Sequence, residues 1–283
     1  MSQTGRRTAL WVQVAIMAAS IAVFLGGVSL VGGGFSDRSA RFWVTVVSIV
    51  FANVVWFNVP IWLVVSDARN QKTFPFQFTA VSFCTLYAAG VFDLETGLKL
   101  MQTRSELMAA AGGGAMTAVI GFDRSQLEAL VNDTDGVSIA NDNSDAQVVI
   151  SGQPDAVESV SANLKCKRAI PLAVSGAFHS PFMAEAAEAF AATLDGVSFR
   201  DARIPVLSNS EPTGCTEAAD LKARLKQQMT TGVRWRETMA SMADGGIDTL
   251  VEIGPGNVLS GLAKRSMNGV TTAQIASSGD LGL

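Results

Sequence analysis

The sequence predicts an α/β protein that contains a ferredoxin-like unit and is preceded by two transmembrane helices. Two long charge-free stretches occupy much of the first 66 residues. Residues 115–174 alternate short β-like runs with amphipathic helices in the order strand–helix–strand–strand–helix–strand, which is the ferredoxin-like arrangement. After residue 180, helices alternate with short apolar runs, a pattern typical of a mostly parallel sheet.

The N-terminal part has the length and composition of membrane spans. Residues 8–36 and 42–66 contain no charged side chain, and each exceeds the ~20 residues that a helix needs to cross a hydrocarbon core. Interfacial tryptophans lie near their ends. We expect transmembrane helices at about residues 8–34 and 42–66, within a membrane segment of residues 1–72.

The basic pair Arg6-Arg7 favours an N-terminus in the cytoplasm, and two spans return the chain to that side. The expected location is therefore the inner (cytoplasmic) membrane, with the C-terminal domain in the cytoplasm and the lipid bilayer as a partner. Two alternatives remain open. The first stretch also resembles a secretory signal with a twin arginine, and residues 73–92 form a third charge-free stretch that is either a span or a buried helix.

The soluble part can be divided into elements along the chain. The ferredoxin-like unit consists of strand 116–121, helix 123–131 with Asp123 as N-cap, strands 137–141 and 147–151 around a polar turn at 141–145, helix 154–164 and strand 167–174. Asn141 and Asn143 are interpreted as turn formers. The later elements are helix 181–194, strand 204–208, helices 220–229 and 235–244, and strand 249–253.

Charge and cysteine content exclude several classes of function. The net charge of −4 gives no electrostatic support for binding nucleic acid. The three cysteines, Cys84, Cys166 and Cys215, have neither disulfide-framework nor metal-ligand spacing. We therefore expect no metal site and no nucleic-acid partner.

The chain has a single histidine, His179, which follows an apolar run in the segment VSGAFHS. One imidazole at the end of a strand is what acyl-transfer chemistry needs beside a nucleophile. A lone histidine is also a common structural residue, so the residue alone leaves both interpretations open. No glycine-flanked serine of the nucleophile-elbow type occurs in the sequence.

Six ordered motifs carry a family resemblance: residues 114–120, 141–152 (NDNSDAQVVISG), 172–183 (LAVSGAFHSPFM), 205–209 (PVLSN), 233–235 (VRW) and 252–259 (EIGPGNVL). Together they resemble bacterial malonyl-CoA:acyl carrier protein transacylase over about the C-terminal two-thirds of the chain. The resemblance implies a truncated acyltransferase (α/β-hydrolase-like) large subdomain, residues 73–113 and 175–283, with an inserted ferredoxin-like small subdomain, residues 114–174.

The family also implies site residues and partners. His179 matches the histidine that activates the nucleophile, and Gln228 matches the glutamine whose backbone carbonyl orients that histidine. Arg104 matches the arginine that binds the malonyl carboxylate, and Asn209 lies in the matching loop beside the site. Malonyl-CoA and acyl carrier protein are the implied partners in fatty acid biosynthesis, with the coenzyme A thioester as substrate and no cofactor.

The family nucleophile is a serine in a Gly-His-Ser elbow, and the resemblance aligns Thr79 with it, between Phe78 and Ala80. Bulky neighbours do not favour that tight turn. The nucleophile is therefore unassigned, with Thr79, Ser82 and Cys84 as candidate substitutes.

The sequence leaves three hypotheses about function open. The first is a working acyltransferase (ACP S-malonyltransferase), and the missing elbow predicts that transfer is lost. The second is a membrane-anchored, non-catalytic remnant that binds acyl carrier protein or coenzyme A. The third is a chimeric reading frame.

Overall fold

The computed structural model describes residues 83, 85–174, 176–253, 257–275 and 280. The two expected membrane spans, at about residues 8–34 and 42–66, lie outside this set. Within the described part of the chain, every helix is too short or too polar to cross a bilayer.

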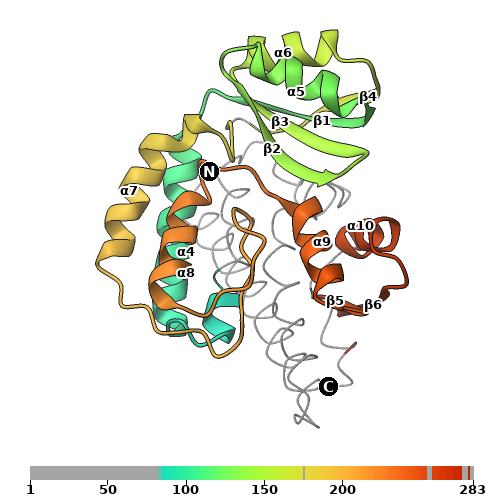
Figure 1. Cartoon of the computed structure of the whole chain (residues 1–283). Coiled ribbons are helices and arrows are strands. Elements are labelled where there is room, and N and C mark those ends of the chain that lie inside the picture. Colours follow the sequence, from blue (N-terminus) through green and yellow to red (C-terminus); the bar gives the residue numbers. More distant parts are fainter. Residues whose placement is uncertain (1–82, 84, 175, 254–256, 276–279, 281–283) are drawn as a thin grey trace.

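The small subdomain, residues 115–171, is a four-stranded sheet with two helices on its outer face (Figure 1). Its strands run in the order β2-β3-β1-β4, and every neighbouring pair is antiparallel. This confirms the ferredoxin-like arrangement expected from the sequence. The elements are β1 (Ala115–Phe122), α5 (Arg124–Asn132), β2 (Val137–Ser144), β3 (Gln147–Gly152), α6 (Pro154–Asn163) and β4 (Cys166–Pro171).

Helix ends in this subdomain follow the predicted signals. The Asp123 side chain accepts a hydrogen bond of 2.8 Å from the backbone N–H of Gln126 and caps α5, as expected for an N-cap aspartate. Pro154 lies in the first turn of α6, where its missing N–H costs no hydrogen bond.

The predicted turn at residues 141–145 is wrong in its extent. Strand β2 continues to Ser144, which pairs with Gln147, and register irregularities occur between Ile139 and Asn141 and between Asp142 and Ser144. Asparagine and aspartate favour turns in isolated chains, but here one face of β2 is buried against the rest of the protein. Tertiary packing therefore overrides the local preference.

The sheet of the small subdomain has two apolar faces. Val119, Val148 and Ile150 pack with Leu127 of α5 in the core of the small subdomain. Met116 and Val149 point the other way and join the main core of the large subdomain. Because side chains alternate along a strand, one sheet serves both cores.

The large subdomain contains two further groups of elements (Figure 1). Helix α4 packs against α7, which in turn packs against α8, and their side chains contribute to the main core. A second core joins α9, α10 and β5 around Trp235. The elements are α4 (Leu94–Ala110), the short helix η5 (Pro181–Met183), α7 (Ala184–Asp195), α8 (Ala218–Gln227), α9 (Trp235–Asp244), β5 (Thr249–Ile253), α10 (Val258–Ser266) and β6 (Thr271–Ile275).

Most predicted elements of this subdomain are present. The bounds predicted for α9 and β5 match those observed, and β5 pairs in parallel with β6. The predicted strand at residues 204–208 is reduced to a single bridge between Val206 and Cys215.

Buried Glu252, at the end of β5, accepts hydrogen bonds from the backbone N–H groups of Leu259 and Ser260. A carboxylate is favourable at the N-terminus of α10, where backbone N–H groups are unpaired.

Candidate active site

His179 lies in a tight loop between β4 and η5. Its φ of 56° makes it the only non-glycine with a positive φ among the residues that the structure describes. Ser180 stabilises this loop, because its hydroxyl donates to the Ala177 carbonyl at 2.5 Å and accepts from the Phe182 N–H at 3.3 Å. A left-handed conformation is uncommon for a residue with a side chain, and such residues are enriched at functional sites.

The imidazole of His179 is oriented by the end of helix α8. Its Nδ1 lies 2.9 Å from the backbone carbonyl oxygen of Gln228, the C-cap residue of that helix. Because a carbonyl can only accept, Nδ1 carries the proton and donates. The lone pair is thereby placed on Nε2, which is the atom that can accept a proton from a nucleophile.

Burial and charge determine the protonation state of His179. Its side chain is buried, and desolvation lowers its pKa to about 4, assisted by the positive charge of Arg104. The pKa lies below the ordinary value of 6.5 because an imidazolium would lie in a buried, positively charged environment. The ring is therefore neutral at neutral pH, as a general base requires.

Arg104 is on the inward face of α4 and is among the largest fully buried side chains. Desolvation lowers its pKa to about 10, so the guanidinium remains charged at neutral pH. Its charge depresses the pKa of His179, which places the two groups in one electrostatic environment. Helix α4 and the His179 loop are far apart in the sequence, and the fold brings their side chains to one site.

A further group of buried side-chain amides has no hydrogen-bond partner among the described residues. Neither the nitrogen nor the oxygen of the Asn209 side chain finds a hydrogen-bond partner among the described residues, and the same holds for Asn141. The backbone carbonyl of Asn209 accepts from Arg234 N–H, and Asn141 forms a bridge with the preceding residue, Val233. Buried polar groups are rarely left unpaired, so these amides are candidates for ligand contacts.

Sequence reasoning included Asn209 but treated Asn141 and Asn143 as turn formers. The structure places both residues on β2, and each is about 1% exposed. The side-chain amide oxygen of Asn143 also lacks a hydrogen-bond partner within the described part. One feature of the sequence could have indicated that both asparagines share a buried strand face. The motif NDNSDAQVVISG alternates asparagine with other residues, which puts both asparagines on one face if the strand extends through them.

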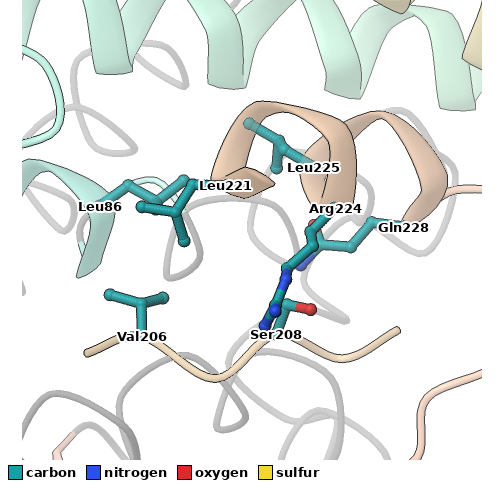
Figure 2. Close-up of a pocket in the computed structure, with 7 residues that line it drawn as sticks. All are labelled: Leu86, Val206, Ser208, Leu221, Arg224, Leu225 and Gln228. Atoms are coloured by element: carbon teal, nitrogen blue, oxygen red, sulfur yellow. The ribbon is translucent and has the colours of Figure 1, made fainter. Parts of the chain in front are cut away.

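A small pocket lies between α8 and the segment that contains Val206, and Figure 2 shows its lining. Its cavity volume is about 20 Å³, room for about one water molecule, and it is lined by Leu86, Val206, Ser208, Leu221, Arg224, Leu225 and Gln228. The guanidinium of Arg224 is already engaged by the carbonyl oxygen of Thr213 and the carboxylate of Asp220. The pocket adjoins the residue that orients His179 but contains neither His179 nor Arg104.

The candidate nucleophiles Thr79, Ser82 and Cys84 all lie outside the described residues. Among the residues that are described, no three His, Cys, Asp or Glu side chains are grouped so that they could hold a metal ion.

The neutral, oriented imidazole of His179 and the buried charge of Arg104 have the chemistry expected of an acyltransferase. Comparison with known sequences agrees. The acyl transferase domain family matches residues 83–279, and this chain belongs to that family.

Individual relatives show which members of this family the chain is similar to. The chain is 46% identical over 222 residues to a malonyl CoA-acyl carrier protein transacylase of Synechocystis sp., which covers 77% of this chain and 76% of the relative. A relative of the same name from Haemophilus influenzae is 41% identical and covers 65% of this chain and 62% of its own length. The chain is thus a homologue of the malonyl-CoA:acyl carrier protein transacylases.

Solved structures show the same fold. A malonyl-CoA:ACP transacylase from Synechocystis sp. has a TM-score of 0.70 at 48% identity, covering 72% of this chain and 70% of its own. A malonyl-transacylase in complex with its type II PKS acyl-carrier protein has a TM-score of 0.67 at 34% identity, covering 72% and 69%.

Proposed function

We propose that this chain binds malonyl-CoA through the site formed by Arg104, His179 and Asn209, and that it transfers malonyl to acyl carrier protein at or near the background rate. The observation that supports binding most strongly is the buried pair of Arg104 and a His179 whose Nδ1 is fixed at 2.9 Å from the Gln228 carbonyl. The two groups have the chemistry that a malonyl thioester requires.

Arg104 is proposed to bind the free carboxylate of malonyl. A guanidinium presents paired N–H donors that match a carboxylate, and lysine cannot reproduce this geometry. Burial strengthens the pairing, because an ionic hydrogen bond is stronger where water is excluded.

His179 has the state of a general base at Nε2; with a nucleophile present, Nε2 would take the proton of the nucleophile and then protonate the departing thiolate. The Asn209 and Asn141 side chains are proposed to contact polar groups of the thioester substrate, since their amides are buried and unpaired within the described part. None of these groups forms the covalent bond itself. Transfer through an acyl-enzyme needs an activated oxygen or sulfur in addition.

The low transfer rate is proposed from the sequence around Thr79. Where the family has Gly-His-Ser, this chain has Phe78-Thr79-Ala80. Loss of the nucleophile typically removes roughly a million-fold in turnover in serine hydrolases. Acyl carrier protein remains the proposed partner, because a transacylase similar to this chain is known in complex with its acyl-carrier protein.

The test is incubation with radiolabelled malonyl-CoA, measuring equilibrium binding and then covalent label on a denaturing gel. We expect binding without stable label, loss of binding in Arg104→Ala, and unchanged binding in the exposed control Arg168→Ala. A stable label that disappears in Thr79→Ala, Ser82→Ala or Cys84→Ala would reveal a working nucleophile and overturn the inactive part of the proposal.

Membrane attachment is proposed separately, from the charge-free stretches at residues 8–36 and 42–66. The C-terminal domain is proposed to face the cytoplasm, since Arg6 and Arg7 precede the first stretch. The full chain should stay with the membrane fraction during alkaline carbonate extraction, and protease added outside sealed cells should leave the C-terminal domain intact. Release into the supernatant would refute attachment.

A further inference from the structure

The connection between α4 and β1 has the properties of a hinge. Three consecutive glycines, residues 112–114, join the large subdomain to the small one. A Cβ on Gly112 or Gly113 would meet no atom within 4 Å, and Gly113 has a φ of +92°. Glycine has the greatest backbone freedom of any residue, and these two make no close packing contact that would restrict it.

The backbone freedom of Gly112 and Gly113 does not extend to Gly114. A Cβ there would lie 2.3 Å from the backbone nitrogen of Ala177, so the chain is closely packed at this point. Ala177 is two residues from His179 and accepts the hydrogen bond from Ser180 that stabilises the loop. A rotation at residues 112–113 would thus pivot the small subdomain close to the candidate site.

On the far side of the small subdomain, strand β2 is attached to the large subdomain by its backbone. The N–H of Asp142 donates to the Val233 carbonyl at 2.8 Å, and the Val233 N–H donates to the Ala140 carbonyl at 2.8 Å. Next to them, a Cβ on Gly232 would lie 2.5 Å from the Ile139 carbonyl oxygen, so this close approach requires glycine.

The Asp142 carboxylate adds a charged contact at the same point. Its Oδ1 accepts from Arg124 Nη2 at 2.9 Å, within the small subdomain, and its Oδ2 accepts from Arg236 Nε at 3.0 Å, across to α9. Asp142 is 15% exposed and Arg236 is 37% exposed, so the cross-subdomain pair is partly shielded from solvent.

We propose that the small subdomain closes over the site by rotating at Gly112 and Gly113, and that the Asp142–Arg236 ion pair is the latch that holds it closed. Asp142 and Arg236 are positioning residues in this scheme. The inference rests on the proposed function, because the result of closure is a site that binds the malonyl thioester.

The contacts around Val233 explain how the latch reaches the site. Asn141, next to Asp142, bridges to Val233, and the following residue, Arg234, donates its N–H to the Asn209 carbonyl at 2.9 Å. The closed latch therefore fixes the unpaired amide of Asn141, from the small subdomain, relative to that of Asn209, from the large one. Opening separates the two amides and removes one side of the site.

The ion pair is one of several restraints on the small subdomain, together with the Val233 backbone hydrogen bonds and the shared main core. A partly exposed ion pair contributes little to folding and is screened by salt. Breaking it should weaken malonyl-CoA binding about fivefold, the factor that corresponds to ~1 kcal/mol. The fold of each subdomain should persist, because the two apolar cores do not depend on this pair.

The binding test compares Arg236→Gln with Arg124→Gln in the full chain, by calorimetric titration with malonyl-CoA at low and high salt. Both changes remove one positive charge beside Asp142, but only Arg236 spans the two subdomains. We expect Arg236→Gln to weaken binding about fivefold and to lose part of the salt dependence, and Arg124→Gln to stay within about twofold of the unmodified chain. Equal binding by Arg236→Gln and the unmodified chain, or equal weakening by both variants, would overturn the latch.

Amide hydrogen exchange tests the latch without relying on malonyl-CoA. Peptides that contain the Asp142 and Val233 amides should exchange faster in Arg236→Gln than in Arg124→Gln or the unmodified chain. If the unmodified chain fails to bind malonyl-CoA, the proposed function is wrong and the exchange rates alone decide the inference. Unchanged exchange in Arg236→Gln would refute it.

Discussion

The small subdomain and the candidate site bury different kinds of side chain. Between the sheet and helices α5 and α6, the buried side chains are apolar, with Leu127, Val148 and Ile150 essentially inaccessible to solvent. The candidate site residues include a buried cation, a buried imidazole and buried amides. The first pattern stabilises the fold, whereas the second carries a desolvation cost that polar contacts must offset.

This contrast separates residues that stabilise the fold from residues whose burial carries an energetic cost at the candidate site. The left-handed backbone of His179 and the lowered pKa of its ring are unfavourable features that the surrounding fold must offset. The small subdomain provides part of that support, because one face of its sheet belongs to the main core. A substitution in its own core should therefore affect stability, and substitutions at the site should affect binding and the response to pH.

The largest effect on stability is expected for Leu127→Ala. Leu127 on α5 is fully buried in the core of the small subdomain, so truncation should leave a cavity and lower the free energy of unfolding by about 2–5 kcal/mol. Urea unfolding of the full chain measures the change.

Leu94→Ala is the matched control, since Leu94 is 39% exposed at the start of α4 and its truncation should change stability by about 0.5 kcal/mol or less. If the two variants proved equally stable, the small subdomain would not depend on its apolar core in the way described.

Much of the fold could be predicted from sequence because its signals are local. The Asp123 cap, the proline in the first turn of α6 and the alternating apolar strands each act over a few residues, and the element order followed from them. Strand β2 was predicted too short because its pairing through Asn143 depends on burial against another part of the chain. The strand at residues 204–208 was overpredicted for the same reason, since apolar content alone does not supply a pairing partner.

The candidate site, like the fold, could be predicted from sequence only in part. The resemblance identified His179, Arg104, Gln228 and Asn209, and the structure brings the imidazole to the Gln228 carbonyl and into the field of Arg104. The fully buried state of Arg104 was not predictable, because a lone arginine on a helix usually lies in solvent. The depressed pKa of His179 follows from that burial and was missed with it.

The pH dependence of stability gives a sharper test of the contrast between the apolar core of the small subdomain and the buried polar site. The ring of His179 has a pKa of about 4 in the folded chain, below the ordinary 6.5 expected when unfolded. Between these values the unfolded chain binds more protons, so stability contributed by the neutral ring is complete above about pH 6.5 and is lost as the pH falls toward 4. By pH 4 the loss should reach roughly 3 kcal/mol.

His179→Gln isolates this contribution, because glutamine does not titrate while the carboxylates elsewhere respond equally in both chains. The difference in unfolding free energy between the original chain and His179→Gln, measured with urea at several pH values, should be constant above pH 6.5 and shift against the original chain below it. A difference that does not vary from pH 7 to pH 4 would mean that the imidazole titrates equally in both states. Burial beside Arg104 would then have no energetic consequence, and the distinction between a stabilising core and a costly site would fail at its central residue.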